Sequence, residues 1–188
     1  TAVSGKGGMG KSTLAAMIVR HWLKRREGPV LAVDADPNST LGDKLGLEVK
    51  CAIGDLREDV LKNKLQAPSD VPKQRKIEYE VQQAIAEGAG FDLLEMGRGE
   101  GPGCYCSVNN MLRTFLDNVS TGYKHIVIDN EAGMEHLSRR TNGKVDLMLI
   151  VCDPTPTGIK AATRIAQLTR KLEVVRGRMG LVLNRSNG

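Results

Sequence analysis

A glycine-rich segment near the amino terminus constrains the fold of this chain more than any other feature. It reads Gly5-Lys-Gly-Gly-Met-Gly-Lys-Ser-Thr13 and joins a short apolar run to a predicted helix. Glycines let backbone N–H groups turn inward around an anion, and the N-terminus of the helix adds a favourable dipole. Lys11 can reach terminal phosphates and the Ser12 hydroxyl can bind Mg²⁺. The alternative to a phosphate-binding loop is a glycine turn that only permits tight packing of the strand against the helix. The predicted nucleotide-binding residues are Gly5, Lys6, Gly7, Gly8, Met9, Gly10, Lys11, Ser12 and Thr13.

Short apolar runs alternate with helical patterns along the rest of the chain. Strands are predicted at Thr1–Val3, Val30–Val33, Phe91–Met96, His125–Ile128, Val145–Val151 and Gly180–Leu183. Helices are predicted at Lys11–Arg26, Ile77–Glu87, Val108–Asn118 and Pro156–Val174, with short helical pieces between Pro37 and Pro72. This alternation is typical of right-handed crossovers between parallel strands. It predicts an α/β fold in three layers, a mostly parallel sheet with helices on both faces.

Composition favours a globular domain and disfavours membrane and secreted proteins. Of the 188 residues, 40% are apolar and 26% are charged, an ordinary balance for a folded domain. The longest apolar run, Leu147–Cys152, is far shorter than the roughly 20 residues that a transmembrane helix needs. From the sequence we expect no signal peptide. We therefore expect a cytoplasmic protein with no membrane partner.

Lys6 distinguishes the glycine-rich segment from an ordinary phosphate-binding loop. The run Lys-Gly-Gly-Met-Gly-Lys-Ser, from Lys6 to Ser12, resembles the deviant Walker A motif of the MinD/ParA/nitrogenase-iron-protein class of dimerising ATPases. The resemblance implies catalytic roles for Lys6 and Lys11 and a P-loop fold. It also implies that Lys6 reaches the partner's nucleotide across a dimer interface, which would couple ATP binding to dimer formation. The alternative is a solvated loop lysine.

Two aspartates occupy positions that match the same class. Asp36, in Asp34-Ala-Asp-Pro37, corresponds to the aspartate that orients the attacking water, and Asp129 resembles the Walker B aspartate. A carboxylate can accept a hydrogen bond from a water in line with the terminal phosphate. Each aspartate alone could be a turn cap, but both follow predicted parallel strands, where ligands bind in open α/β sheets. The expected Mg²⁺ residues are Ser12, Asp36 and Asp129.

The end of the chain also resembles this class. Leu181-Val-Leu-Asn184-Arg185 is similar to the strand that ends in an adenine-recognising asparagine, so Asn184 and Arg185 are assigned to the nucleotide. Asn130-Glu-Ala-Gly133 takes the place of the second switch. The class normally continues with a further strand and helices. We therefore expect residues 1–188 to be a single P-loop ATPase domain that lacks its amino-terminal start and those C-terminal elements.

Cys104 and Cys106 form a pair in the segment Gly101-Pro-Gly-Cys-Tyr-Cys106. Two thiolates at i and i+2 supply half of a four-coordinate site, and a dimer axis would supply the other half. Ni²⁺, Zn²⁺ or Cu⁺ would fit four sulfur ligands. Unliganded thiols or a labile disulfide are the alternatives. Cys152 ends an apolar strand and is expected to be a core residue.

The context of the cysteine pair carries a closer resemblance. The stretch Glu95–Cys106 and the stretch Ile128–Leu137, with the phosphate loop upstream, resemble the CooC family of nickel-insertion ATPases for carbon monoxide dehydrogenase. The related AcsF family for acetyl-CoA synthase is equally similar. The resemblance implies that Cys104 and Cys106 bind Ni²⁺ between two protomers while ATP controls closure, with one of these enzymes as client. Zn²⁺ accepts the same thiolates, and His136 has no assigned role.

These features predict an ATP- and Mg²⁺-dependent metallochaperone that forms a nucleotide-dependent homodimer. One alternative is a ParA/MinD-like switch that acts on DNA or membrane. Ten basic against three acidic residues from Arg139 to Gly188 favour that alternative, but they are scattered, so nucleic acid is not the expected partner. Another alternative is an electron-transfer ATPase with a bridging iron–sulfur cluster. That family takes its ligands from well-separated positions, which Cys104 and Cys106 do not match.

Overall fold

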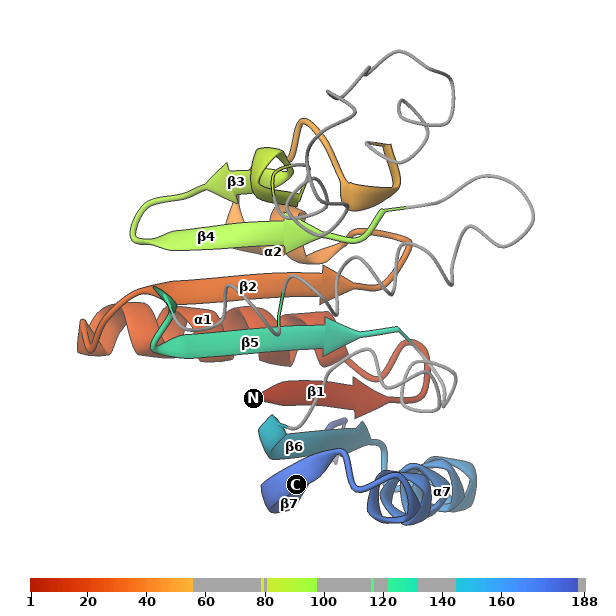
Figure 1. Ribbon diagram of the computed structural model, residues 1–188. Helices are drawn as coiled ribbons and strands as arrows, with labels where there is room; N and C mark the ends of the chain where they lie inside the picture. Colours follow the sequence, from red (N-terminus) through yellow and green to blue (C-terminus); the bar gives the residue numbers. More distant parts are fainter. Residues whose placement is uncertain (56–78, 80, 98–115, 117–121, 132–144, 186–188) are drawn as a thin grey trace, which may run out of the picture.

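The computed structural model describes residues 1–55, 79, 81–97, 116, 122–131 and 145–185. Within these residues a seven-stranded sheet has the order β3-β4-β2-β5-β1-β6-β7 (Figure 1). The strands are β1 Ala2–Gly5, β2 Val30–Ala35, β3 Ile85–Glu87, β4 Phe91–Glu95, β5 His125–Asn130, β6 Val145–Cys152 and β7 Val175–Leu183. All neighbouring pairs are parallel except β3 and β4. The predicted α/β fold with a mostly parallel sheet is confirmed.

Two long helices cover the sheet through separate core clusters. Helix α1 (Lys11–Arg25) places Ala15, Ala16 and Val19 in a cluster with Val3 of β1. Helix α7 (Pro156–Lys171) places its buried side chains in the other cluster, with Ala2 as the β1 residue. Because Ala2 and Val3 are successive strand residues, they point to opposite faces. The two helices therefore lie on opposite faces, as a three-layer fold requires.

The predicted helix over Ile77–Glu87 is wrong at its C-terminal end, where the chain forms strand β3. Ile85 pairs with Leu94 and Glu87 pairs with Asp92 in antiparallel register. A tight glycine turn joins β3 to β4, closed by the Gly88 N–H donating to the Phe91 carbonyl at 2.8 Å. Pairing along the edge of the sheet thus overrides the helix preference of alanine and glutamate in this segment.

Two other boundaries differ from expectation. Helix α7 ends at Lys171 rather than Val174, because Glu173 has a left-handed φ of 51° that stops the helix. Strand β7 begins at Val175, five residues before the predicted Gly180, and pairs along β6. The predicted helix over Val108–Asn118 lies outside the described residues except for Leu116. Cys152 is buried in the core, as predicted.

The arrangement of the sheet brings several loops to one edge. Strands β4, β2, β5 and β1 run in the same direction, so their carboxyl ends meet on the side where β1 enters the phosphate loop (Figure 1). A short helix, α2 (Leu41–Leu45), follows β2 at this edge. Among the described helices, none has the length and apolar character to cross a membrane.

Candidate nucleotide and magnesium site

The phosphate loop connects β1 to α1 and requires glycine at several points. Gly8 and Gly10 have φ angles of 75° and 91°, a left-handed conformation that L side chains rarely adopt. A Cβ atom at Gly5 would clash with the carbonyl oxygen of Val151 in β6. Gly10 is the N-cap of α1, and no side chain caps this helix. Its first N–H groups therefore stay available to an anion, as the sequence predicts.

Asp129 occupies the position expected of a magnesium residue. It is fully buried near the end of β5, and neither carboxylate oxygen makes a well-formed hydrogen bond within the described structure. Burial raises the pKa of Asp129 to about 7, and the nearby Ser12 hydroxyl and Lys11 ammonium oppose that rise. A buried carboxylate without a partner is costly. A cation bound beside the hydroxyl of Ser12 would offset that cost, so these residues fit Mg²⁺.

The segment after β2 contacts the phosphate loop through a residue that the sequence analysis missed. Thr40 donates a hydrogen bond from Oγ1 to the Ser12 Oγ at 3.0 Å. Asp34, at the end of β2, accepts hydrogen bonds from the N–H groups of Asp36 at 3.0 Å and Leu41 at 2.8 Å. Asp34 is therefore an anchor for this segment. The only signal for Thr40 in the sequence is its short distance downstream of Asp36.

Asp36 itself lies in a turn beside the loop, partly buried. Its Oδ1 accepts hydrogen bonds from the backbone N–H and the side-chain Nδ2 of Asn38, both at 2.9 Å. These contacts orient one carboxylate oxygen and leave the other for a water or a cation. The structure thus brings Asp36, Ser12 and Asp129 to the same edge of the sheet, while their roles in hydrolysis stay predictions.

Asn184 also lies against the phosphate loop. Its backbone N–H donates to the Cys152 carbonyl, and its side-chain Nδ2 donates to the Met9 carbonyl, both at 2.8 Å. A Cβ atom at Gly10 would lie 2.6 Å from that Nδ2, so glycine is needed for this close approach as well. The N–H of Arg185 donates to the Asn184 Oδ1 at 2.9 Å. The sequence placed Asn184 in the nucleotide site, and the structure adds a direct contact with the loop.

We expect Asn184→Ala to weaken the binding of ATP and GTP by a similar factor of about five, because one hydrogen bond that preorganises the loop is lost. Titrations with fluorescent analogues of both nucleotides measure this. Asn184→Asp should be weaker still, since a carboxylate would face the Met9 carbonyl. A loss confined to ATP would instead assign Asn184 to adenine recognition alone.

Lys6 is exposed on the outer side of the loop. Asp153 follows β6, and its pKa is lowered mainly by the hydrogen bond from the Thr155 hydroxyl. The nearby charge of Lys6 also lowers this pKa. The Thr155 Oγ1 donates to Asp153 Oδ1 at 2.6 Å and accepts from the Gly158 N–H at 3.0 Å, which caps α7. An exposed Lys6 is compatible with the predicted reach toward a second protomer.

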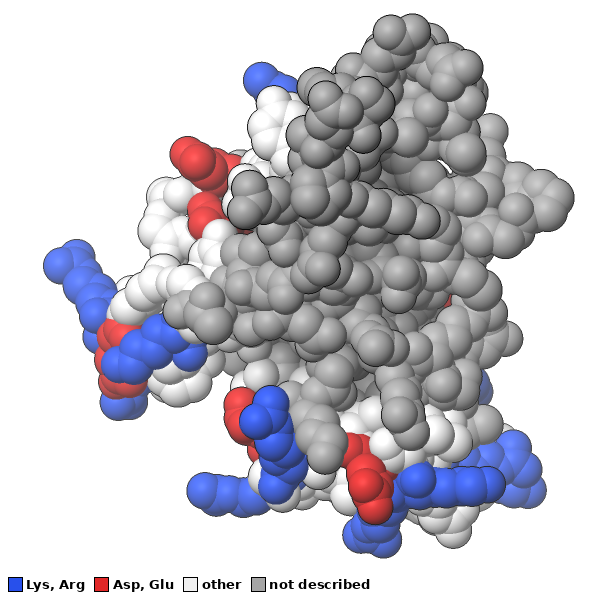
Figure 2. All heavy atoms as spheres, in the orientation of Figure 1, with Lys and Arg blue, Asp and Glu red and all other residues white. Residues whose placement is uncertain are grey.

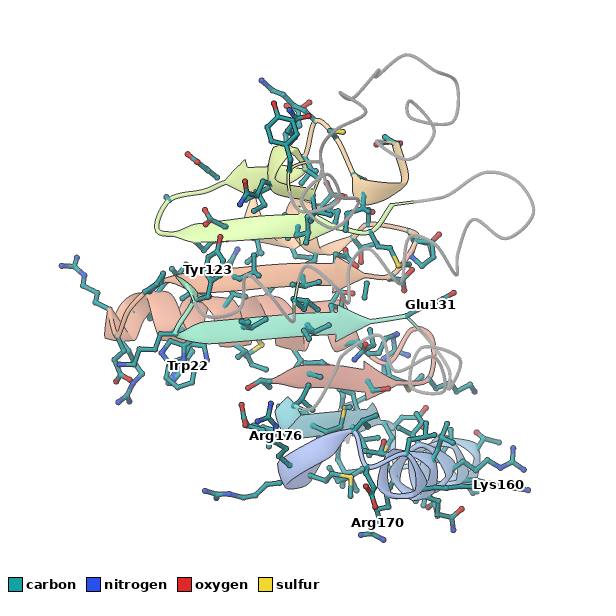
Figure 3. The ribbon with its side chains drawn as sticks, in the orientation of Figure 1. Trp22, Tyr123, Glu131, Lys160, Arg170 and Arg176 are labelled. Atoms are coloured by element: carbon teal, nitrogen blue, oxygen red, sulfur yellow. The ribbon has the colours of Figure 1, made fainter. Side chains whose placement is uncertain are left out.

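The predicted metal ligands Cys104 and Cys106 lie outside the described residues, as does His136. In the described part of the chain, no group of three or more His, Cys, Asp or Glu side chains is arranged to hold a metal ion. His125, the first residue of β5, stacks on Trp22 with ring centroids 3.7 Å apart, and Figure 3 shows Trp22 near the start of β5. This stacking contact indicates a structural role for His125.

Comparisons with known proteins place these features in a family. The CobQ/CobB/MinD/ParA nucleotide binding domain matches residues 1–188. An uncharacterized ATP-binding protein of Methanocaldococcus jannaschii, MJ0685, is 43% identical over 175 residues, which are 92% of this chain and 69% of that protein. The carbon monoxide dehydrogenase accessory protein CooC of Rhodospirillum rubrum is 34% identical over 185 residues, 92% of this chain and 70% of CooC.

Solved structures agree on the fold. The cell division protein MinD of Aquifex aeolicus superimposes with a TM-score of 0.64 at 24% identity, covering 99% of this chain and 68% of MinD. A ParA family ATPase of Chlorobium tepidum gives a TM-score of 0.69 at 18% identity, covering 99% and 74%. Together with the glycine loop and the carboxylates around it, these matches show that the chain belongs to the CobQ/CobB/MinD/ParA family of nucleotide-binding domains.

Proposed function

We propose that this protein is a Mg²⁺-dependent ATPase that serves as a nickel metallochaperone. The observation that carries the ATPase assignment is the buried Asp129 carboxylate, which makes no well-formed hydrogen bond among the described residues, beside the Ser12 hydroxyl and the uncapped start of α1. When bound, Mg²⁺ would neutralise charge on the nucleotide phosphates. Ser12 and Asp129 would hold the cation, Lys11 would contact the terminal phosphates, and Asp36 would orient the attacking water.

The nickel assignment rests on the cysteine pair and on the likeness to CooC. Cys104 and Cys106 are separated by one residue, and the chain is 34% identical to a carbon monoxide dehydrogenase accessory protein. Two protomers would together supply four thiolates to one Ni²⁺. ATP bound by both protomers would draw Lys6 of each toward the other's phosphates, and hydrolysis would reopen the dimer. The proposed client is carbon monoxide dehydrogenase or acetyl-CoA synthase.

A Ni²⁺ titration of the reduced protein tests the metal site. We expect thiolate-to-nickel charge-transfer absorbance to saturate at one Ni²⁺ per two chains, and Cys104→Ser/Cys106→Ser to abolish it. Affinity should rise with pH, because protons compete for the thiolates. The control is Cys51→Ser, since the half-buried Cys51 lies outside the pair. Unchanged Ni²⁺ binding in the double variant would remove the metallochaperone proposal, and Zn²⁺ displacement would measure selectivity.

The alternative function is a ParA/MinD-like switch that acts on DNA. Basic side chains gather over α7 and β7, at the lower edge of the molecule in Figure 2. Helix α7 has four basic and no acidic residues, and Figure 3 shows Lys160, Arg170 and Arg176 extending outward from this region. Salt-sensitive DNA binding that requires ATP would favour this alternative. DNA binding that is absent or independent of ATP would favour the metallochaperone.

A further inference from the structure

Glu95 is a buried carboxylate to which the proposed hydrolysis assigns no role. It is the last residue of β4 and is 7% exposed. In the sheet it pairs in register with Asp34 of β2, which in turn pairs with Asp129 of β5. Three carboxylates therefore stand in a row across three adjacent strands, whose spacing is about 4.8 Å. Such a row is unfavourable unless each carboxylate makes contacts that compensate.

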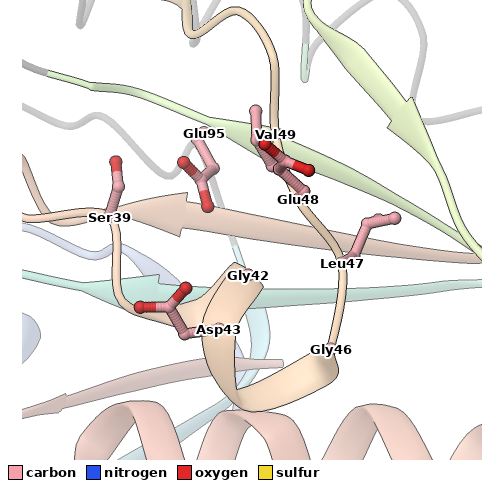
Figure 4. A pocket seen from close by; sticks show the side chains of 8 residues that line it. All are labelled: Ser39, Gly42, Asp43, Gly46, Leu47, Glu48, Val49 and Glu95. Carbon is pink, nitrogen blue, oxygen red and sulfur yellow. The ribbon is translucent and has the colours of Figure 1, made fainter.

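The Glu95 side chain packs against the start of α2. Its Oε1 lies 2.6 Å from the position that a Cβ atom would take at Gly42, so only glycine allows the helix to approach this closely. Burial, and then the charge of Asp34, raise the pKa of Glu95, while the nearby Ser39 hydroxyl and Gly42 backbone N–H oppose that rise. The Ser39 Oγ is buried and makes no hydrogen bond of good geometry among the described residues. Figure 4 shows the carboxylate between Ser39 and Gly42.

Each residue from Ser39 to Gly42 is thus held by the sheet or by the phosphate loop. Glu95 faces Ser39 and Gly42, Asp34 accepts from the Leu41 N–H, and Thr40 donates to Ser12. Ser39 has a φ of 46°, a left-handed conformation that is strained for a residue with a side chain. A strained backbone persists only where its surroundings fix it. Among the described residues, the Ser39 N–H donates to the Asp36 carbonyl, Asp34 accepts the Leu41 N–H, and Glu95 packs against Gly42.

We propose that Glu95 is a positioning residue for the nucleotide site. Its carboxylate fixes the segment Ser39–Gly42, and thereby keeps Thr40 against the hydroxyl of Ser12 that would bind Mg²⁺. The expected effect of Glu95 on hydrolysis rests on the proposed Mg²⁺-dependent ATPase function. The expected effect of Glu95 on the segment Ser39–Gly42 does not. Two kinds of measurement therefore test it, one of which needs no nucleotide.

The first measurement is amide hydrogen exchange in the absence of nucleotide. In Glu95→Ala, peptides that span residues 39–46 should exchange at least about tenfold faster, because the packing of the carboxylate against Gly42 is lost. Glu95→Gln should fall between this variant and the wild type, since its side chain still packs against Gly42 but carries no charge. If Glu95→Ala fails to fold, the acceleration in Glu95→Gln decides. Exchange at the wild-type rate in both variants would overturn the proposal.

The second measurement separates nucleotide binding from the use of Mg²⁺. Glu95→Ala should bind ATP in EDTA within about twofold of wild type, because the phosphate loop is intact. Its Mg²⁺-dependent hydrolysis should fall about tenfold, with a higher Mg²⁺ concentration at half-maximal rate, and Glu95→Gln should recover part of this loss. Glu95 and Glu48 both line a pocket of about 520 Å³ beside α2. Because Glu48 is exposed, Glu48→Gln is the matched control.

The outcomes distinguish this proposal from the proposed function. A wild-type protein that does not hydrolyse ATP would contradict the ATPase assignment, while the exchange rates would still decide the role of Glu95. If ATP binding in EDTA, hydrolysis and the melting temperature all fall together, Glu95 contributes to general stability. That result would overturn the positioning role. Faster exchange confined to residues 39–46, with the split between binding and hydrolysis, would support it.

Discussion

Asp129→Asn is expected to stabilise the nucleotide-free protein while it abolishes hydrolysis. Burial raises the pKa of Asp129 to about 7, and an acid whose pKa is raised in the folded state destabilises that state once it is ionised. Asparagine removes the buried charge but leaves an amide to satisfy, so we expect a gain of about 2 kcal/mol at pH 8. The gain should be mostly lost as the pH falls toward 4, where the carboxyl is protonated in the folded state and about half protonated in the unfolded state.

The same substitution should lower Mg²⁺-dependent ATP hydrolysis by roughly two to three orders of magnitude, because a carboxylate that holds the cation is lost. Urea denaturation in EDTA at pH 8 and pH 4, beside a phosphate-release assay, measures both effects. The control is Asp146→Asn, an exposed aspartate near the start of β6 at the other end of the sheet. A variant that loses stability at pH 8, or that keeps its hydrolysis, would contradict the assignment of Asp129.

Asp129→Asn is expected to raise stability and to lower hydrolysis. These opposite effects distinguish a functional carboxylate from a structural one. Asp34 is also buried, and burial raises its pKa, but it accepts hydrogen bonds from Asp36 and Leu41. Removing its charge would leave those N–H groups without an acceptor, and would therefore destabilise the protein. Asp129 makes no such contact in the described structure. A carboxylate kept at a cost to stability is typical of a binding site.

Local sequence patterns predicted the parts of the site that depend on local structure. The phosphate loop follows from its glycines and from the strand and helix beside it. Asp36 and Asp129 were found by their resemblance to a class of ATPases, and their places after predicted parallel strands supported that assignment. The contact of Thr40 with Ser12 was missed, and so was the packing of Glu95 against Gly42, because both join residues that are distant in sequence.

The error at β3 has a similar cause. Ile85, Ala86 and Glu87 are compatible with a helix, and nothing local distinguishes them from the residues before them. Their strand conformation comes from pairing with β4 after the turn at Gly88–Gly90. The glycines in that turn were the available signal, since glycine clusters between two apolar runs indicate a hairpin. Edge strands of this kind depend on tertiary context more than on their own composition.

Lys6→Ala is expected to separate nucleotide binding from dimer formation. In the proposed site, Lys11 and the N–H groups of the loop would contact the nucleotide from the same chain, so ATP affinity should stay within about threefold of wild type. Lys6 is exposed in the single chain, and in the proposed dimer it would neutralise charge on the partner's phosphates. Its loss should therefore abolish the ATP-dependent dimer and lower hydrolysis by roughly two to three orders of magnitude, like the loss of other cations supplied in trans.

Light scattering on a size-exclusion column, with a non-hydrolysable ATP analogue, measures the dimer, and a fluorescent analogue measures binding. Lys24→Ala is the matched control, because Lys24 is also exposed but lies in the last turn of α1, away from the loop. If Lys6→Ala dimerises like wild type, Lys6 is a solvated loop lysine and the coupling between ATP and the dimer must come from other residues. If it loses nucleotide binding as well, Lys6 acts on the nucleotide of its own chain. Only retained binding with a lost dimer supports a lysine that acts across the interface, and with it a closure that could change the geometry of a shared thiolate site.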